Sequence, residues 1–237
     1  MARRSKNYQE AVKLLDKTRD YSPEEAITLA KKMVHVKFDE TVELHLRMGI
    51  DPRNASQQVR SIALLPHGLG KKVRVLVFAQ GEAEKIAETA GADFAGGDEL
   101  IKKVNDGWLE FDTAIATPDM MSKVGKLGKV LGRRGLMPNP KSGTVVATDD
   151  LPRAIGDARK GRVEIKLDRT AIIHVPLGKL SFEDDKLLEN LTAVIEAVMR
   201  AKPSGTKGQY VKSVSLTTTM GPGISLDLRP TLSLSAA

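Results

Sequence analysis

The sequence predicts an α/β protein of two domains: a discontinuous α+β domain of the split β-α-β type at residues 1–68 and 161–237, with an inserted Rossmann-like, three-layer α/β domain at residues 69–160. Near both ends of the chain, apolar and polar residues alternate, as in strands that bury one face. Between them, short apolar runs alternate with helical segments, which predicts a parallel sheet. Glycines at 68–70 and at 161 mark the two crossings and are the predicted hinge; one continuous domain is the alternative.

The amino-terminal segment predicts one helix and one strand. Ser22, Pro23 and Glu25 form a helix start, with a capping serine, a proline in the first turn and a glutamate at the capping-box position. This helix is expected to end before Asp39. Residues 41–48 then alternate between polar and apolar side chains, which predicts a strand with one buried face.

The middle of the chain predicts strands and helices in alternation. Its first strand is apolar almost throughout, as in a sheet that helices cover on both faces. Strands are expected at 73–79, 92–95 and 112–117, and helices at 82–90, 97–104, 118–123 and from 149 to 161.

Beyond residue 161 the sequence predicts a pair of strands, a long helix, a last strand and a frayed tail. Ser181 is expected to cap the helix, which runs from Phe182 to about Ala201 and carries one apolar stripe. The strands are expected at 163–167, 171–175 and 211–220, and the tail after 223.

The composition favours a polyanionic partner. The chain has 237 residues and a formal net charge of +7, which favours a nucleic acid or an anionic membrane surface. Aromatic residues are 4% of the total, which disfavours a reader of single-stranded bases that works by stacking. The absence of cysteine excludes disulfides, thiolate zinc sites and a cysteine nucleophile. No apolar run reaches the length of a signal peptide or a membrane span, so we expect a soluble cytoplasmic protein with no membrane partner.

The motifs predict no catalytic residue, no metal and no cofactor. The first strand of the middle segment is followed by Gln80-Gly81-Glu82, without a dinucleotide fingerprint. Acidic pairs at 149–150 and 184–185 stand near predicted helix starts, where capping and the helix dipole explain them. The histidines lack the spacing of metal ligands, and each is expected to be an ordinary surface or core residue. They are His35, His45, His67 and His174.

A row of hydroxyls is the first candidate binding feature. Hydroxyls both donate and accept hydrogen bonds, which suits ribose 2′-OH groups and phosphate oxygens. After Met220, Gly221 has no side chain, so a nucleic-acid backbone can approach closely. The alternative is a solvated edge strand closed by a turn. In a strand, four hydroxyls share one face: Ser213, Ser215, Thr217 and Thr219.

The entry to the first strand, residues 37–43, is the second candidate. If that strand lies near the last one, Thr41 and Glu43 share a surface with the hydroxyl row. A carboxylate there accepts hydrogen bonds from a base amino group or a 2′-OH, which specifies a partner rather than attracting it. In the alternative, Glu43 pairs with Arg47. For Phe38 the hydrophobic core is the favoured place.

The third candidate is the basic, glycine-rich segment 126–141, which is expected to be a flexible loop. Phosphate contacts from this segment would position a nucleic acid without specifying its sequence. A solvated loop without a partner is the alternative. The basic side chains are Lys126, Lys129, Arg133, Arg134 and Lys141.

Together these motifs resemble the bacterial-type ribosomal protein L1 family. The most specific is LGKVLGRRGLMPNPK at 127–141, in which Arg133 departs from the proline of the family pattern. The other motifs follow in the family's order: KFDETVE at 37–43, LPHGLGK at 65–71, AGAD at 90–93, FD at 111–112, ATPD at 116–119 and TTTMGP at 217–222.

The resemblance implies a structural constituent of the large ribosomal subunit and not an enzyme. It implies binding to large-subunit ribosomal RNA at the mobile stalk and help in releasing the exit-site tRNA. It also implies repression of translation of the protein's own mRNA. The implied partners are therefore the stalk rRNA, the exit-site tRNA and the leader of that mRNA.

The same resemblance implies which residues meet the RNA. The basic segment, and Lys37 beside the main surface, would supply auxiliary phosphate contacts. Two rivals stay open: an α/β enzyme acting on RNA or nucleotides, and a general basic coat protein of nucleic acids. The implied RNA-binding residues are Lys37, Phe38, Thr41, Glu43, Ser213, Thr217, Thr219, Met220 and Gly221, and the auxiliary ones are Lys126, Lys129, Arg134 and Lys141.

Overall fold

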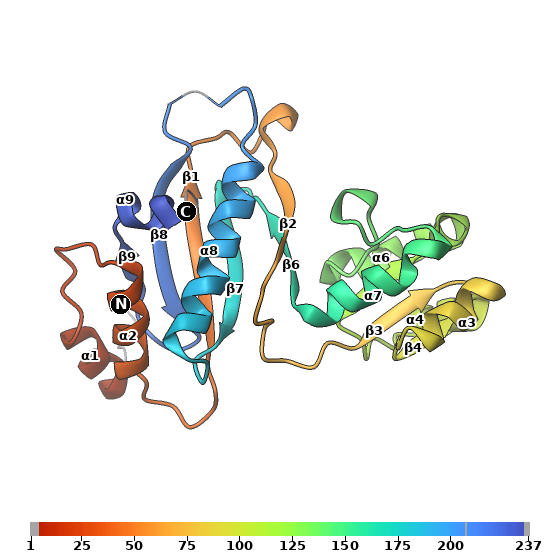
Figure 1. Ribbon diagram of the computed structural model, residues 1–237, viewed down its shortest axis with the longest axis horizontal. Helices are drawn as coiled ribbons and strands as arrows, with labels where there is room; N and C mark the ends of the chain where they lie inside the picture. Colours follow the sequence, from red (N-terminus) through yellow and green to blue (C-terminus); the bar gives the residue numbers. More distant parts are fainter. Residues whose placement is uncertain (1–4, 207, 235–237) are drawn as a thin grey trace. The chain divides into compact units, whose positions relative to one another are not determined.

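The computed structural model describes residues 5–206 and 208–234, which form three sheets and the helices around them (Figure 1). The protein is mixed α/β and one of its sheets is parallel, so that part of the prediction is confirmed. The chain divides into two compact units. The first comprises the described residues up to Gly70 and from Val163 onward, and the second is Lys71–Arg162. Within the described ranges, no helix has the length and apolar character needed to cross a membrane.

A four-stranded antiparallel sheet is the centre of the first unit. Strand β1 (Thr41–Met48) lies between β7 (Ile172–Lys179) and β8 (Val211–Thr218), and β9 (Ile224–Leu226) pairs with β8. Alternate residues of β1 are buried, which confirms the strand predicted from alternation and gives it one inner face. Those buried residues are Val42, Leu44, Leu46 and Met48.

Two helices pack against the inner face of this sheet. Helix α2 (Pro23–Lys32) begins after Ser22, whose hydroxyl accepts a hydrogen bond from the backbone of Glu25 at 3.2 Å, so the predicted start is confirmed. Figure 1 shows α2 and α8 (Asp184–Arg200) on the same side of the sheet. A short helix that the sequence did not predict, α1 (Lys6–Lys13), precedes them in the chain. The apolar stripe of α8 is fully buried: Leu187, Leu191, Val194, Ile195 and Val198.

The predicted cap of this long helix is wrong. Helix α8 begins at Asp184 with Glu183 at the capping position, not after Ser181. The Ser181 hydroxyl instead donates to the Asp39 carboxylate at 2.8 Å, and the Ser181 backbone N–H donates to its other oxygen at 3.1 Å. These bonds tie the segment before α8 to the entry of β1. Because they join residues 142 positions apart, local spacing gives no sign of them.

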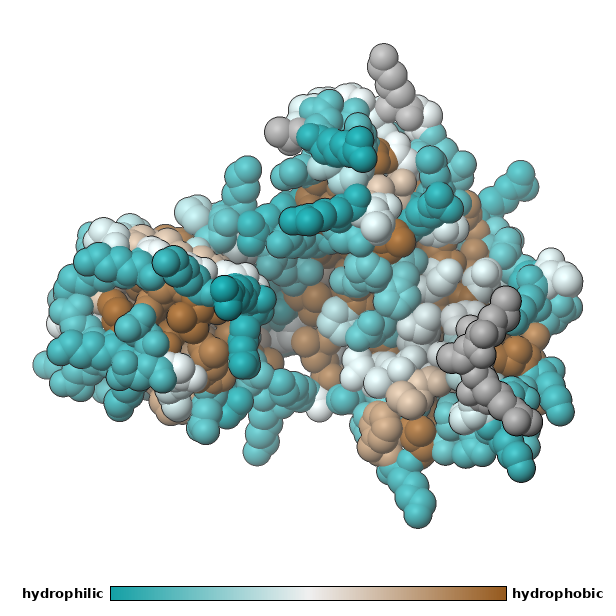
Figure 2. Space-filling view, turned by 180° about the vertical axis from the view of Figure 1, so that it is seen from behind, coloured by the Kyte–Doolittle hydropathy of each residue, from teal (hydrophilic) through white to brown (hydrophobic). Residues whose placement is uncertain are grey.

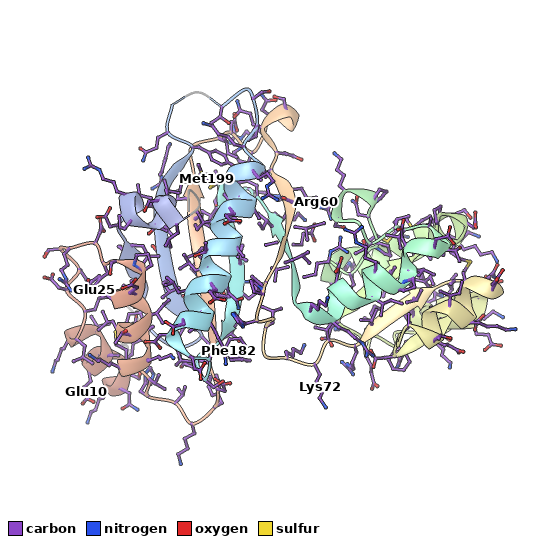
Figure 3. The ribbon with its side chains drawn as sticks, in the orientation of Figure 1. Glu10, Glu25, Arg60, Lys72, Phe182 and Met199 are labelled. Atoms are coloured by element: carbon purple, nitrogen blue, oxygen red, sulfur yellow. The ribbon has the colours of Figure 1, made fainter. Side chains whose placement is uncertain are left out.

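A second, two-stranded sheet joins β2 (Arg60–Leu64) and β6 (Arg162–Lys166). Strand β2 was not predicted from the sequence, and residues 163–167 were expected to pair with 171–175. That pairing is wrong, because β6 lies beside β2 and β7 lies beside β1, with an isolated bridge between Leu167 and Ile173. Arg60, labelled in Figure 3, forms an ion pair with Glu164 between the two strands.

A buried asparagine connects α8 to the chain just before the first glycine crossing. The Asn190 amide donates to the carbonyl oxygens of Gly68 at 3.1 Å and Leu177 at 2.7 Å. Its own oxygen accepts from the backbone N–H of His67 at 3.1 Å. The ring of Phe182, labelled in Figure 3, would be 2.9 Å from a side chain added at Gly70. The chain up to Gly68 is thus held to α8 of the first unit.

The second unit contains the parallel sheet, in the order β4-β3-β5. Every residue of β3 (Val75–Phe78) is buried, as predicted for a strand covered on both faces. One face of the sheet packs with α4 (Asp98–Asn105), and the other packs with α3 (Glu82–Thr89) and α7 (Leu151–Lys160). The outer strands are β4 (Phe94–Gly96) and β5 (Thr113–Ala116).

Residues 118–134 are a series of short helical turns, so the predicted flexible loop is wrong over much of its length. Helix α5 (Met121–Val124) and helix α6 (Gly128–Leu131) alternate with single 3-10 turns. Leu127 and Leu131, four positions apart, are both buried in the core of the second unit. This helical spacing of apolar residues holds the segment in place although glycines interrupt it.

The tail after Gly223 is ordered where the sequence analysis expected fraying. Strand β9 completes the four-stranded sheet, and helix α9 (Leu228–Ser233) follows it. The backbone N–H of Tyr21 donates to Ser225 at 3.0 Å, and that of Asp227 donates to Tyr21 at 2.8 Å. Ile224 and Leu226 are buried, so the prediction is wrong there, while residues 235–237 lie outside the described part of the chain.

We expect Asn190→Ala to lower the free energy of unfolding by about 2–4 kcal/mol, because it leaves one buried N–H and two carbonyl groups without partners. Urea unfolding of the full chain measures this change. The control is Glu189→Ala, which removes an exposed ion pair with His67 and should cost less than about 1 kcal/mol. Equal losses for the two variants would contradict the role of Asn190.

Candidate nucleic-acid interface

The polar residues of the alternating strands point to the outer face of the four-stranded sheet. We call it the open face and define it by the outward residues of its three longest strands. Figure 2, which looks at the molecule from behind, shows teal and pale residues across it with some brown between them. The residues are Thr41, Glu43, His45 and Arg47 of β1, Ile172, His174 and Pro176 of β7, and Ser213, Ser215 and Thr217 of β8.

The first and last of the predicted binding segments meet at one end of the open face. Glu43 lies directly opposite Thr217 in the β1–β8 pair. Just beyond this pair, the backbone N–H of Thr41 donates to the Thr219 hydroxyl at 3.0 Å, and that hydroxyl is 3.4 Å from the Thr41 carbonyl oxygen. Residues 178 positions apart are therefore neighbours. The expected proximity of the two segments is an observed feature of the fold.

The hydroxyl row faces solvent, and its members differ in what they contact. The Thr217 hydroxyl lies 3.0 Å from a ring nitrogen of His45, and the Thr219 hydroxyl binds the backbone of Thr41. Ser213 and Ser215 make no side-chain hydrogen bond with any described residue. Two hydroxyls thus have a fixed partner, and two have their full hydrogen-bonding capacity left for a ligand.

Two large apolar side chains are exposed beside the Thr41–Thr219 contact. Phe38 is 53% exposed and Met220 is 50% exposed. The core position favoured for Phe38 is therefore wrong. Phe38 stands in an irregular segment before β1, so the alternation of the strand does not direct its side chain inward. Exposed apolar groups within a polar surface are typical of contact sites, and Lys37 next to Phe38 is exposed as well.

Gly221 closes the turn after β8, and the turn itself requires a glycine. The Gly221 N–H donates to the Thr218 hydroxyl at 3.1 Å. A side chain added at Gly221 would lie 2.4 Å from that same oxygen. The close approach that the sequence suggested for a nucleic acid is thus made first by the chain's own Thr218.

A pair of histidines on the open face was not predicted from the sequence. His45 and His174 are directly opposite each other in the β1–β7 pair, and their Nδ1 atoms lie 2.7 Å apart. Glu43, for which pairing with Arg47 was the alternative, has its carboxylate 3.9 Å from His45. Burial and the neighbouring His174 lower the pKa of His45, although Glu43 acts in the opposite direction. The alternation in β1 predicts that His45 faces outward with the other polar residues. It gives no sign that His174 lies opposite.

The basic segment lies in the second unit. Its side chains are exposed and form no ion pair with described residues, so their charges are available to a polyanion. The described residues also contain no cluster of three or more acidic or histidine side chains that could hold a metal ion. The exposed basic residues are Lys126, Lys129, Arg133, Arg134 and Lys141.

Comparison with known proteins finds similarity along the chain. A family profile described as the ribosomal protein L1p/L10e family matches residues 29–222. A protein named large ribosomal subunit protein uL1, from Dehalococcoides mccartyi strain 195, is 66% identical over 237 residues, which is 100% of each chain. The uL1 protein of strain BAV1 is 68% identical over 97% of each chain. That of Thermomicrobium roseum is 54% identical over 98% of this chain and 97% of its own.

We expect Gly221→Ala to destabilise the protein by about 1–3 kcal/mol, because the new methyl group overlaps the Thr218 hydroxyl. Thermal unfolding with a two-state fit gives the value. Gly223→Ala is the matched control two residues away. Its nearest neighbour would be at 3.4 Å, an ordinary contact, so a change within about 0.5 kcal/mol is expected. A Gly221→Ala protein as stable as the control would show that the turn relaxes freely.

Proposed function

Because this chain belongs to the ribosomal protein L1 family, we propose that it is a structural constituent of the large ribosomal subunit and that its open face binds large-subunit ribosomal RNA. The protein is a ribosomal protein and not an enzyme, so the rival prediction of an α/β enzyme is dropped. The RNA that the open face takes is the stalk segment that the resemblance implies.

The contact between Thr41 and Thr219 is the observation that carries this proposal. It joins the two segments, 37–43 and 217–222, whose motifs contribute most to the RNA surface that the family resemblance implies. Neither segment needs its exposed residues for packing, since Phe38 and Met220 each leave about half of their surface to solvent. An exposed apolar pair beside hydroxyls and a carboxylate suits a ligand with both sugar edges and polar groups.

The recognition we propose depends on shape and on hydrogen bonding. A folded RNA presents 2′-hydroxyls that donate and accept, and base edges that do the same. Glu43 accepts hydrogen bonds only, so it selects donors such as a 2′-OH or a base amino group. The hydroxyls of Ser213, Ser215 and Thr217 suit either kind of partner. Lys37 and the net charge of +7 attract the phosphate backbone without reading its sequence.

For the architecture we propose a discontinuous α+β domain of the split β-α-β type, residues 1–68 and 161–237, that carries an inserted Rossmann-like domain, 69–160. The two compact units and the parallel sheet of the second one support this proposal. Gly70 and Gly161 have φ of 69° and 101°, backbone angles that favour glycine, and they are the proposed hinge.

The resemblance also supports two roles beyond rRNA binding. The stalk-bound protein would assist the release of tRNA from the exit site. The same open face would bind a similar RNA fold in the protein's own mRNA and so repress its translation. In both roles the basic residues Lys126, Lys129, Arg134 and Lys141 would supply auxiliary phosphate contacts.

A competition assay tests the RNA proposal directly. A transcript of the stalk segment is bound to the full chain at fixed, near-physiological salt, and unrelated structured RNA or duplex DNA is added as competitor. Strong preference for the stalk transcript is expected. Equal competition by all three nucleic acids would instead favour the general coat protein.

Phe38→Ala and Met220→Ala should each weaken binding of the stalk transcript by about 1–2 kcal/mol, or about five- to thirtyfold in Kd, because each removes apolar surface that the RNA covers. Filter binding or fluorescence anisotropy measures the Kd. Leu64→Ala, another residue with 53% exposure but outside the open face, is the control and should bind normally. Wild-type affinity in both the Phe38 and the Met220 variant would contradict the site assignment.

Replacing Lys126, Lys129, Arg134 or Lys141 with glutamine should change the salt dependence more than the specificity. Each lost phosphate contact lowers the slope of log K against log salt by about one. Titrations at several potassium chloride concentrations give the slope. Lys85→Gln, in α3 of the same unit, is the control for a change of charge alone. A slope that stays at the wild-type value in all four variants would show that this segment does not contact phosphates.

A further inference from the structure

A chain of hydrogen-bonding groups crosses the open face beside the hydroxyl row. His45 Nε2 lies 3.0 Å from the Thr217 hydroxyl, and His45 Nδ1 lies 2.7 Å from His174 Nδ1. His174 Nε2 in turn lies 3.6 Å from the carboxylate of Asp168. Three strands and the turn before β7 therefore contribute to one connected row, Thr217–His45–His174–Asp168.

The contact between the two Nδ1 atoms restricts where the hydrogens are. At 2.7 Å one nitrogen must carry the hydrogen and the other must present its lone pair. A neutral imidazole has one N–H, so the choice at Nδ1 fixes the state of Nε2. All donors in the row therefore point the same way. The state of His174 Nδ1, donor or acceptor, determines whether His45 Nε2 donates a hydrogen bond to Thr217 or accepts one from it.

In the uncharged row, Asp168 favours a hydrogen on His174 Nε2, which leaves His174 Nδ1 as the acceptor. His45 then donates from Nδ1, and its Nε2 lone pair accepts the Thr217 O–H. Because the Thr217 hydrogen is donated to His45, the Thr217 oxygen can only accept a hydrogen bond from a ligand on the open face.

Uptake of one proton reverses this row. The proton binds at His45 Nε2, and the shared hydrogen moves from His45 Nδ1 to His174 Nδ1, so that His174 holds the positive charge and His45 stays neutral. His45 Nε2–H now donates to the Thr217 oxygen, whose own O–H becomes free to donate outward. One proton is gained, and no other group is altered.

The surroundings favour placing the charge on His174. The His174 side chain is 51% exposed and the His45 side chain 25% exposed, so water solvates a charge on His174 better. The lowered pKa of His45 agrees with its staying neutral. The charged outward groups of the elements that carry the pair are Glu43 and Arg47 of β1, Asp168 before β7 and Lys179 at the end of β7. β8 presents only neutral Ser215 and Thr217 to it.

We infer that the His45–His174 pair is a positioning device that sets whether Thr217 donates or accepts a hydrogen bond toward the bound RNA. The inference rests on the proposed function, since the ligand is the RNA of the open face. The facing RNA group is an acceptor, such as a phosphate oxygen or a base carbonyl, so protonation of the pair strengthens binding.

The experiment measures the affinity of the full chain for the stalk transcript between pH about 8 and about 6, the range in which histidine titrates, at fixed ionic strength. The wild-type Kd should fall by about three- to tenfold over this range, the range expected for one added hydrogen bond. His174→Gln should abolish the change, since glutamine takes up no proton. Thr217→Val should abolish most of it, since valine keeps the shape but has no hydroxyl to reverse.

His67→Gln is the matched control, because His67 lies in the same unit but pairs with Glu189 away from the open face. It should keep the wild-type pH profile. A full pH response in Thr217→Val would overturn the inference, because charge attraction alone would then explain the effect. A flat wild-type profile would overturn it as well.

Nitrogen-15 spectra of the free protein separate this inference from the RNA proposal. When the His45–His174 pair takes up a proton, the hydrogen of His45 should move from Nδ1 to Nε2, which the imidazole nitrogen shifts report without any RNA. An unchanged His45 tautomer would overturn the inference even if the transcript binds. Failure of the transcript to bind in preference to unrelated RNA, with the tautomer change present, would refute the RNA proposal alone.

Discussion

The antiparallel pairing of β1 with β8 is the constraint on which the rest of the first unit depends. It brings Glu43 opposite Thr217 and places Thr41 against Thr219, although these residues are far apart in the chain. Because side chains alternate along a strand, a slip of one residue would turn the polar side inward and the apolar side outward. The burial of Leu44 and Leu46 therefore fixes the register that also assembles the open face.

The two faces of the same sheet have different surroundings. The inner face packs with α2 and α8 in a continuous apolar core, and the outer face stays uncovered by helices. Polar groups on the outer face are free to form contacts with a partner instead of with each other. Where they do contact one another, as in the His45–His174 pair, one nitrogen donates and the other accepts, and in the proposed device a single proton reverses these roles.

Local patterns predicted the elements well and the long-range contacts poorly. Alternation identified β1 and β8 and the side on which Thr217 lies, and an apolar run identified the buried β3. The family resemblance supplied the proposed roles of the exposed residues. The sequence could not predict that Ser181 binds Asp39, nor that His45 meets His174, because each contact joins segments more than 120 residues apart.

The central place of β1 has a consequence for the order in which the chain folds. Both of its partner strands are made later, after the whole second unit has left the ribosome that synthesises the protein. The contiguous second unit contains all strands of its own sheet and can fold while the nascent chain is still growing. Until β7 and β8 emerge, β1 has two unpaired edges that invite aggregation, so this protein should depend on chaperones most strongly late in its synthesis.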